Sequence, residues 1–293
     1  MDEKLQKVLA RAGVGSRREM ERWIDQGRVK VNDHVATLGE RVSEKDLIKV
    51  DNKIINQKRT QVQQRVIVYH KPVGEVCTRD DPEGRKTIFS NLPKVKNGRW
   101  ISIGRLDLNT SGLLLLTTDG ELANKLMHPS SEIEREYAVR VLGEVSPDIL
   151  KQLKTNVALD DGDAHFTEIK EAGGEGANHW YNVTLKEGRN REVRRLWEYF
   201  GFAVSRLMRI RYGDIKLERR VRPSKSEDLT EEEMIKLYES VGLKYVTEEN
   251  RPAKKDKSRF KANKTAKNAN RSLYKGKGAK GSSSKTGGPR RSR

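Results

Sequence analysis

Positive charge is distributed so unevenly along this 293-residue chain that it limits which part of the chain can fold. Residues 251–293 carry 16 Lys or Arg and one acidic residue, Asp256, which gives a net charge of +15, whereas residues 1–250 carry only +3. The same stretch consists mainly of Lys, Arg, Gly, Ser and Asn, so it cannot bury enough apolar surface to offset its ordering entropy. We therefore expect a disordered basic tail over 251–293, attracted to phosphates without sequence preference.

Cysteine and histidine usage argues against a metal or disulfide protein. Cys77 is the only cysteine, and the five histidines are scattered without ligand-like spacing. Asp160-Asp161-Gly162-Asp163 is reminiscent of a calcium loop but lacks the rest of an EF-hand, so a turn is expected. No apolar run approaches the roughly 18 residues of a membrane span, and the N-terminus is too charged for a secretory signal. We expect a soluble cytoplasmic protein with no cofactor, no metal and no membrane partner.

Residues 1–60 have the pattern of a small module of helices and strands. Apolar residues at i, i+3, i+4 and i+7 predict an amphipathic helix that Gly13 ends; they are Leu5, Val8, Leu9 and Ala12. Ser16 and Glu19 form a capping box that opens a second helix, which Gly27 stops. Short strands are predicted at 29–31 and 47–50.

Basic side chains surround the two predicted helices. Those singled out as RNA contacts are Lys7, Arg11, Arg17, Arg18 and Arg28. Composition alone leaves a solvated helix surface and an RNA-binding surface about equally favoured. The stretches 5–10, 16–18 and 27–32 resemble the S4 RNA-binding domain. That family binds folded RNA mainly through phosphate and shape contacts, and the resemblance implies that these cations bind RNA phosphates.

A larger domain is predicted over 64–245, after a polar stretch at 56–65 that reads as a linker. Strands are predicted near 66–69, 113–117, 135–142 and 180–185, and helices at 121–127, after Ser146-Pro147 and after Thr230. These strands do not alternate regularly with long helices. The fold class expected is therefore α+β, with a largely antiparallel mixed sheet flanked by helices, rather than a doubly wound sheet.

Asp107 is the first candidate for chemistry, because it lies in a turn that enters a strongly hydrophobic strand within 104–120. Local chemistry favours an ordinary turn or cap residue by about two to one. Arg105 and Asp107 flank Leu106 where the chain enters the sheet. A carboxylate beside a buried strand has a firm scaffold and could act as a nucleophile if a cation keeps it ionised.

A candidate cation comes from a predicted helix within 188–201. At about 100° per residue, its apolar side chains share one face: Val193, Leu196, Trp197 and Phe200. Arg191 and Arg195 fall opposite, towards solvent. Arg194 lies beside the apolar stripe, where its stem can be buried while its guanidinium reaches inward. The alternative is an ordinary basic helix lying on RNA, and both interpretations can hold for different arginines.

The stretch 104–118 resembles, position for position, the active-site signature of the RsuA-type pseudouridine synthases. Supporting stretches are 70–74, 135–139, 187–195 and 207–213, and the resemblance spans about residues 3–245, including the S4 domain. It implies that Asp107 is the nucleophile, that Tyr137 stacks on the target base and is a candidate base for the C5 proton, and that Arg194 pairs with the aspartate. Less directly, it implies that Arg105 occupies the space left by the flipped nucleotide.

The implied reaction isomerises a specific uridine to pseudouridine: the N1–C1′ bond breaks, the base turns, and C5 joins C1′. It needs no redox partner, metal or ATP. Asp107 could attack C1′, attack C6, or act as a base at C2′, and the sequence leaves these routes open. In every case the uridine must leave its stack, at an expected cost of a few kcal/mol.

The expected partner is a stem-loop of large-subunit (23S) ribosomal RNA, free or in an assembly intermediate, bound by a monomer. Arg191 and Arg195 join the cations expected to contact it. Two alternatives stay open: a non-catalytic RNA-binding factor of ribosome assembly, and the same isomerisation on 16S rRNA or tRNA. The presence of Asp107, Tyr137 and Arg194 together disfavours a pure binding factor, which would need none of the three.

Overall fold

The computed structural model describes residues 2–55, 63–95 and 98–246, all within one compact unit, 1–246. The predicted basic tail and most of the predicted linker lie outside the described residues. Within the described part of the chain, no helix is long and apolar enough to cross a membrane.

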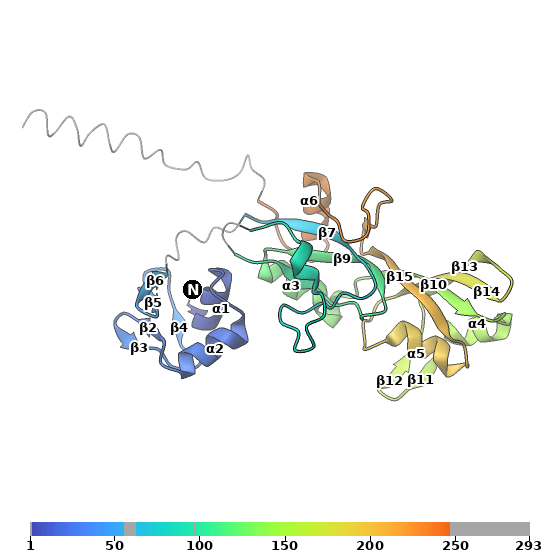
Figure 1. Ribbon diagram of the computed structural model, residues 1–293, viewed down its shortest axis with the longest axis horizontal. Coiled ribbons are helices and arrows are strands. Elements are labelled where there is room, and N and C mark those ends of the chain that lie inside the picture. The colour runs from blue at the N-terminus through green and yellow to red at the C-terminus, as the bar shows by residue number, and fades with distance from the viewer. Residues whose placement is uncertain (1, 56–62, 96–97, 247–293) are drawn as a thin grey trace, which may run out of the picture. The chain divides into compact units, whose positions relative to one another are not determined.

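Residues 3–55 form helices and short strands around a core of their own (Figure 1). The helices are α1 (Leu5–Arg11) and α2 (Arg17–Asp25). One sheet has the order β3 (His34–Val35), β2 (Val29–Val31), β5 (Ile48–Val50), β6 (Lys53–Ile55), while β1 (Glu3–Lys4) pairs with β4 (Arg41–Val42). The predicted capping box is present: the Ser16 hydroxyl accepts from the Glu19 amide, and the Glu19 carboxylate accepts from the Ser16 amide, both at 3.1 Å.

The second part of the chain is built on a nine-stranded sheet (Figure 1). Its main order is β13 (Glu168–Glu175), β14 (Asn178–Leu185), β10 (Arg135–Leu142), β15 (Val204–Tyr212), β9 (Ser111–Thr117), β7 (Val66–Lys71), β17 (Ser226–Asp228), with β8 (Ile101–Ile103) on β9 and β16 (Ile215–Lys216) on β15. Among the described strands, only β9 and β15 run parallel, so the prediction of a largely antiparallel mixed sheet is confirmed.

Helices cover both faces of this sheet, and two separate cores result. One core includes Leu114 and Leu116 of β9 and the face of α5 (Glu192–Tyr199); the other includes Leu113 and Leu115 with α3 (Gly120–Met127) and α6 (Glu231–Glu239). Because successive side chains of a strand point to opposite faces, a strand covered on both sides must be apolar throughout. This explains why 113–116 is an unbroken leucine run.

The remaining predicted helix starts agree with the structure in detail. Ser146 caps α4 (Pro147–Leu153), and Thr230 with Glu233 forms a capping box on α6. Asp119 is the N-cap of α3, and its carboxylate accepts a hydrogen bond from the Glu121 amide at 2.8 Å. Two short 3-10 helices, Ile88–Asn91 and Pro129–Ser131, and the hairpin β11 (Val157–Leu159)–β12 (Gly162–Ala164) complete the described elements.

Gly112 lies where the parallel strands β9 and β15 meet, opposite Arg209. Its φ is +105°, and a Cβ added there would lie 2.2 Å from the backbone oxygen of Arg209. Both the backbone angle and the contact exclude a side chain. We expect Gly112→Ala to lower the free energy of unfolding by about 1–3 kcal/mol, measured by urea denaturation.

Gly39→Ala is a matched control for this prediction. Gly39 also has a positive φ, +85°, but no atom lies within 4 Å of its would-be Cβ. Only the backbone penalty then remains, and we expect a loss of at most about 1 kcal/mol. If the two variants lose the same stability, the close approach of β9 and β15 is not what requires Gly112.

Candidate active site

A cavity of about 720 Å³ opens where the strands β10 and β15 meet the start of α5 and the turn that precedes β9. Two of the three predicted catalytic residues, Asp107 and Tyr137, line it, together with Arg105. Arg194 is not among the described residues that line the cavity, although it is 93 % buried close to them. The fold therefore brings together side chains from segments far apart in the sequence.

The turn that carries Asp107 is stabilised by hydrogen bonds from a fully buried lysine, Lys71. Its Nζ donates to the carbonyl oxygens of Asp107 at 3.0 Å and Thr110 at 2.8 Å, and also to that of Pro72 at 3.0 Å. The Thr110 amide donates to the Asp107 carbonyl at 3.1 Å within the turn itself. The backbone from Asp107 to Thr110 is thus fixed by hydrogen bonds.

The Lys71 ammonium also supplies positive charge next to the turn. Burial lowers the pKa of Lys71 below its usual value, while the neighbouring Cys77, Glu75 and Asp107 act in the opposite direction. Glu75, itself buried, accepts hydrogen bonds from Tyr69 at 2.6 Å and Asn91 at 3.1 Å. Burial and Glu75 raise the pKa of Tyr69 to about 12. The turn of Asp107 therefore packs against buried polar groups, Lys71 and Glu75, as well as against apolar side chains.

Arg194 holds the same turn from the helix side. Its Nη2 donates to the Asn109 carbonyl at 2.9 Å and its Nη1 to the Val204 carbonyl at 2.8 Å. The direct ion pair with Asp107 that the resemblance implied is not formed within 4.0 Å among the described residues. Burial and the neighbouring Arg191 lower the pKa of Arg194, whereas the Asp107 charge raises it. Arg194 thus acts on the turn of Asp107 through the backbone carbonyl of Asn109.

Tyr137 reaches the cavity from β10, the strand next to β15. It is 8 % exposed, and its register partners are Val183 on β14 and Arg209 on β15. Its exposed fraction is small because the ring packs in the same core as Leu106 and Leu207. A ring held in this way at a cavity wall presents a rigid apolar surface on which a planar base can stack.

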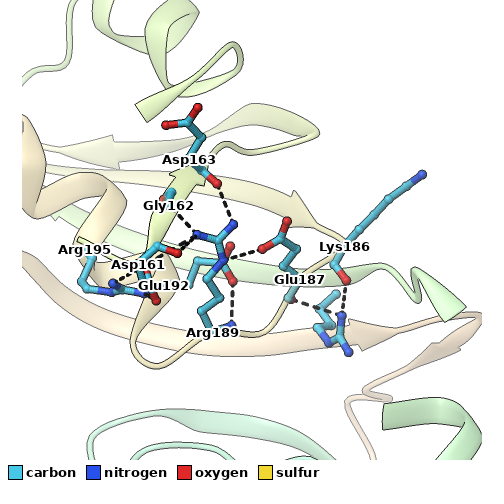
Figure 2. Close-up of polar contacts among 9 residues, drawn as sticks. Asp161, Gly162, Asp163, Lys186, Glu187, Arg189, Glu192 and Arg195 are labelled. Atoms are coloured by element: carbon cyan, nitrogen blue, oxygen red, sulfur yellow. Dashed lines mark hydrogen bonds and ion pairs between the residues drawn. The ribbon is translucent and has the colours of Figure 1, made fainter. Parts of the chain in front are cut away.

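The segment 188–191 lines the cavity, and Arg189 joins it to the β11–β12 hairpin (Figure 2). Figure 2 shows its guanidinium reaching the carbonyls of Gly162 at 2.9 Å and Asp163 at 2.6 Å, and the Glu187 carboxylate at 2.6 Å. Arg195 forms a bidentate pair with Asp161 at 2.8 and 2.9 Å. The acidic stretch 160–163 is thus the turn of a hairpin, and the described residues contain no group of three or more candidate metal ligands.

The other cations expected to contact RNA differ in how they are engaged. Lys7 and Arg11 both pair with Glu3, at 2.9 and 2.5 Å, and Arg191 pairs with Glu198 at 3.2 Å. Arg28 forms a bidentate pair with Asp51 and stacks 3.9 Å from the centroid of the Trp23 ring. Three of these arginines form no side-chain hydrogen bond or ion pair with any described residue: Arg17, Arg18 and Arg105. These three are all exposed, so their charge is free to meet phosphates.

Two family models match parts of this chain. The family described as RNA pseudouridylate synthase matches residues 65–199, and the S4 domain matches residues 3–48. The chain is 55 % identical over 266 residues to ribosomal large subunit pseudouridine synthase B of Yersinia pestis, covering 90 % of this chain and 84 % of the relative. The chain belongs to the RNA pseudouridylate synthase family. Its N-terminal module is an S4 domain.

Two further similarities extend this result. Ribosomal large subunit pseudouridine synthase B of Pseudomonas aeruginosa is 57 % identical over 246 residues, which is 83 % of this chain but only 64 % of that relative's length. A crystal structure of a pseudouridylate synthase superposes with a TM-score of 0.57 at 26 % identity, covering 80 % of this chain and 99 % of that one. The pseudouridine synthase fold is therefore shown by sequence and by structure.

Two residues of this synthase site were not singled out from the sequence, Lys71 and Arg209. Arg209 lines the cavity and is 2 % exposed. The alternation of side chains along a strand could have identified both residues. Lys71 falls on the same face as Ile67 and Tyr69, and Arg209 on the same face as Leu207, so alternation alone places each charge inside. A charged residue at an inward position of an apolar strand is a candidate for the site.

Proposed function

We propose that this protein isomerises a specific uridine of large-subunit (23S) ribosomal RNA to pseudouridine, with Asp107 as the nucleophile. The observation that carries the proposal is the cavity lined by Asp107 and Tyr137, in which the turn of Asp107 is held by two buried cations, Lys71 and Arg194. The choice of substrate is supported by the names of relatives that are 55–58 % identical.

The proposed chemistry uses the cavity in two ways. Lys71 and Arg194 hold the turn of Asp107 through its backbone carbonyls, so that the Asp107 carboxylate is presented to the cavity, where it can attack carbon or accept a proton. Tyr137 stacks on the flipped base and excludes water from its reacting edge, and it is positioned to act on the C5 proton. Asp107 forms no hydrogen bond with any described residue through its carboxylate, so that group is free to react.

The proposed RNA complex uses the S4 domain for positioning. Unpaired cations such as Arg17 and Arg18 bind phosphates, which fixes the register of the RNA without reading bases. Arg105, at the cavity, is placed to fill the space that the flipped nucleotide leaves. The substrate is a stem-loop met by a monomer on free or partly assembled RNA, where an unpaired uridine leaves its stack at the least cost. The proposed division of the chain is 1–60, 64–245 and 251–293.

The test is pseudouridine mapping by carbodiimide treatment and primer extension on large-subunit rRNA from cells that lack this protein. Rescue is done in parallel with the native chain and with Asp107→Asn. We expect one stop to be lost, to return with the native chain, and to stay absent with Asp107→Asn. If no large-subunit stop changes, the substrate is wrong; if Asp107→Asn restores the stop, the nucleophile is wrong. A binding role in ribosome assembly would then explain the S4 domain better.

Deletion of residues 251–293 should weaken RNA binding and flatten its dependence on salt, because that stretch carries a net charge of +15. Turnover at saturating RNA should be largely kept, since the described residues that line the cavity all lie before residue 247. Binding is measured by titration at several salt concentrations and turnover in a single-turnover assay. A large fall of the saturated rate would show that the tail takes part in more than affinity.

A further inference from the structure

Arg209 is a buried cation in the cavity with most of its donors unused. The side chain is 2 % exposed and lines the cavity. Its Nε donates to the Leu113 carbonyl at 2.8 Å, and its Nη2 is buried with no hydrogen-bond partner among the described residues. A guanidinium has five N–H donors, and leaving them unpaired away from water is unfavourable. An acceptor that is not part of the described chain would remove this penalty.

The surroundings of Arg209 contain no carboxylate that could balance its charge. Among the described residues, no Asp or Glu lies within ion-pair distance of it. The contrast is Arg211 on the same strand, which pairs with Glu134 at 3.1 Å and Glu136 at 2.8 Å. Arg211 is therefore paired with carboxylates within the protein. The Arg209 guanidinium lies over the Tyr212 ring, 5.3 Å from its centroid, and still has donors for whatever occupies the cavity.

The position of Arg209 in the sheet indicates which part of a bound nucleotide it meets. Arg209 is the register partner of Tyr137 on β10 and of Gly112 on β9. Paired residues on antiparallel strands point to the same face of the sheet, and both side chains line the cavity, beside a bulge between Glu136 and Tyr137. A base stacked on that ring has its edge within reach of the guanidinium. The ribose-phosphate backbone must stay joined to the rest of the RNA at the cavity mouth, away from a buried group.

We propose that Arg209 binds a carbonyl oxygen of the target uracil and thereby holds the flipped base in the cavity. This inference rests on the proposed function, because it assumes that the cavity receives a uridine. Uracil suits the site because its two carbonyl oxygens are acceptors at the ring edge. Arg209 is then a substrate-contacting residue of the reaction, beside Asp107 and Tyr137.

The experiment measures the affinity of the full chain for two synthetic stem-loops centred on the uridine located by mapping. One RNA contains the uridine, and the other has an abasic site in its place. Both are titrated by fluorescence anisotropy against proteins that carry Asp107→Asn, so that no turnover occurs. We expect Arg209→Gln to weaken binding of the uridine RNA by about 10- to 100-fold and to leave binding of the abasic RNA unchanged.

The matched control is Arg211→Gln in the same background, which removes an arginine from the same strand. Because Arg211 is paired within the protein, its loss should not change the preference for the uridine RNA over the abasic RNA. Thermal melting checks that each variant is folded. If Arg209→Gln does not fold, Arg209→Lys replaces it. Lysine keeps the charge but loses the forked donors, and it should reduce the preference by at least about threefold.

Each outcome decides the inference. If Arg209→Gln weakened binding of the uridine RNA and of the abasic RNA equally, Arg209 would act on the fold or on a phosphate, and the inference would be overturned. An unchanged affinity for both RNAs would overturn it too. The chain with Asp107 intact is tested separately for pseudouridine formation in the uridine RNA. If it forms none, the proposed function fails and the inference falls with it; if it forms pseudouridine while the preference is unaffected by Arg209→Gln, the inference alone fails.

Discussion

Replacing Asp107 with asparagine should abolish pseudouridine formation while leaving the protein folded and able to bind RNA. The amide has nearly the same shape as the carboxylate but is neither a nucleophile nor a base. We expect the single-turnover rate at saturating RNA to fall by roughly 10⁴-fold or more. Because the Asp107 carboxylate has no hydrogen bond with any described residue, the melting temperature should change little. The rate is measured by tritium release from C5-labelled uridine in the RNA.

A matched control for this substitution is Asp160→Asn. Asp160 is exposed in the β11–β12 turn and does not line the cavity, so removal of its charge should leave the rate unchanged. A rate loss confined to Asp107→Asn would separate a chemical role from a general effect of losing one carboxylate. A normal rate for Asp107→Asn would contradict the proposed nucleophile.

Arg194→Ala should damage both stability and activity, since Arg194 joins α5 to the turn of Asp107. The substitution leaves the carbonyls of Asn109 and Val204 without their donor. We expect the free energy of unfolding to fall by about 2–4 kcal/mol, measured by urea denaturation. The saturated rate should also fall by roughly 10²-fold, because a small displacement of the reacting group is enough for that loss. Binding of RNA should be affected least.

The neighbouring substitution Arg195→Ala is the control. Arg195 also lies on α5 but pairs with a partly exposed Asp161, and such pairs contribute at most about 1 kcal/mol. Its rate should stay near that of the native chain. Arg194→Lys, which keeps the charge but cannot reach both carbonyls with a planar fork, should recover only part of the rate. Full recovery by lysine would show that the charge matters and the geometry does not.

The two arginines of α5 also show how far the sequence could predict the site. Helical periodicity placed Arg194 beside the apolar stripe and Arg195 away from it, which agrees with their burial in the structure. Periodicity could not show that Arg194 binds two carbonyls and that Arg195 binds a hairpin turn. Those partners come from segments distant in the chain, and only the packing of α5 brings them into reach.

The helix starts were predictable because capping is a local exchange of hydrogen bonds. Ser16 with Glu19 and Thr230 with Glu233 each satisfy amides a few residues away, so the sequence contains all that is needed. The leucine run 113–116 was equally informative, since only a strand covered on both faces can remain apolar throughout. The order of the nine strands was not predictable, because pairing between β9 and β15 joins residues far apart in the chain.

The sequence by itself determined where the helices and several of the strands lie, which part of the chain carries the excess charge, and, through its resemblance, which residues are candidates for the site. These depend on local hydrogen bonds, on the period of apolar residues and on composition. Only the tertiary structure decided that the Lys71 ammonium binds the Asp107 carbonyl and that Arg209 pairs in register with Tyr137. A buried charge gains its role from the acceptors around it, and those acceptors are brought together by the sheet.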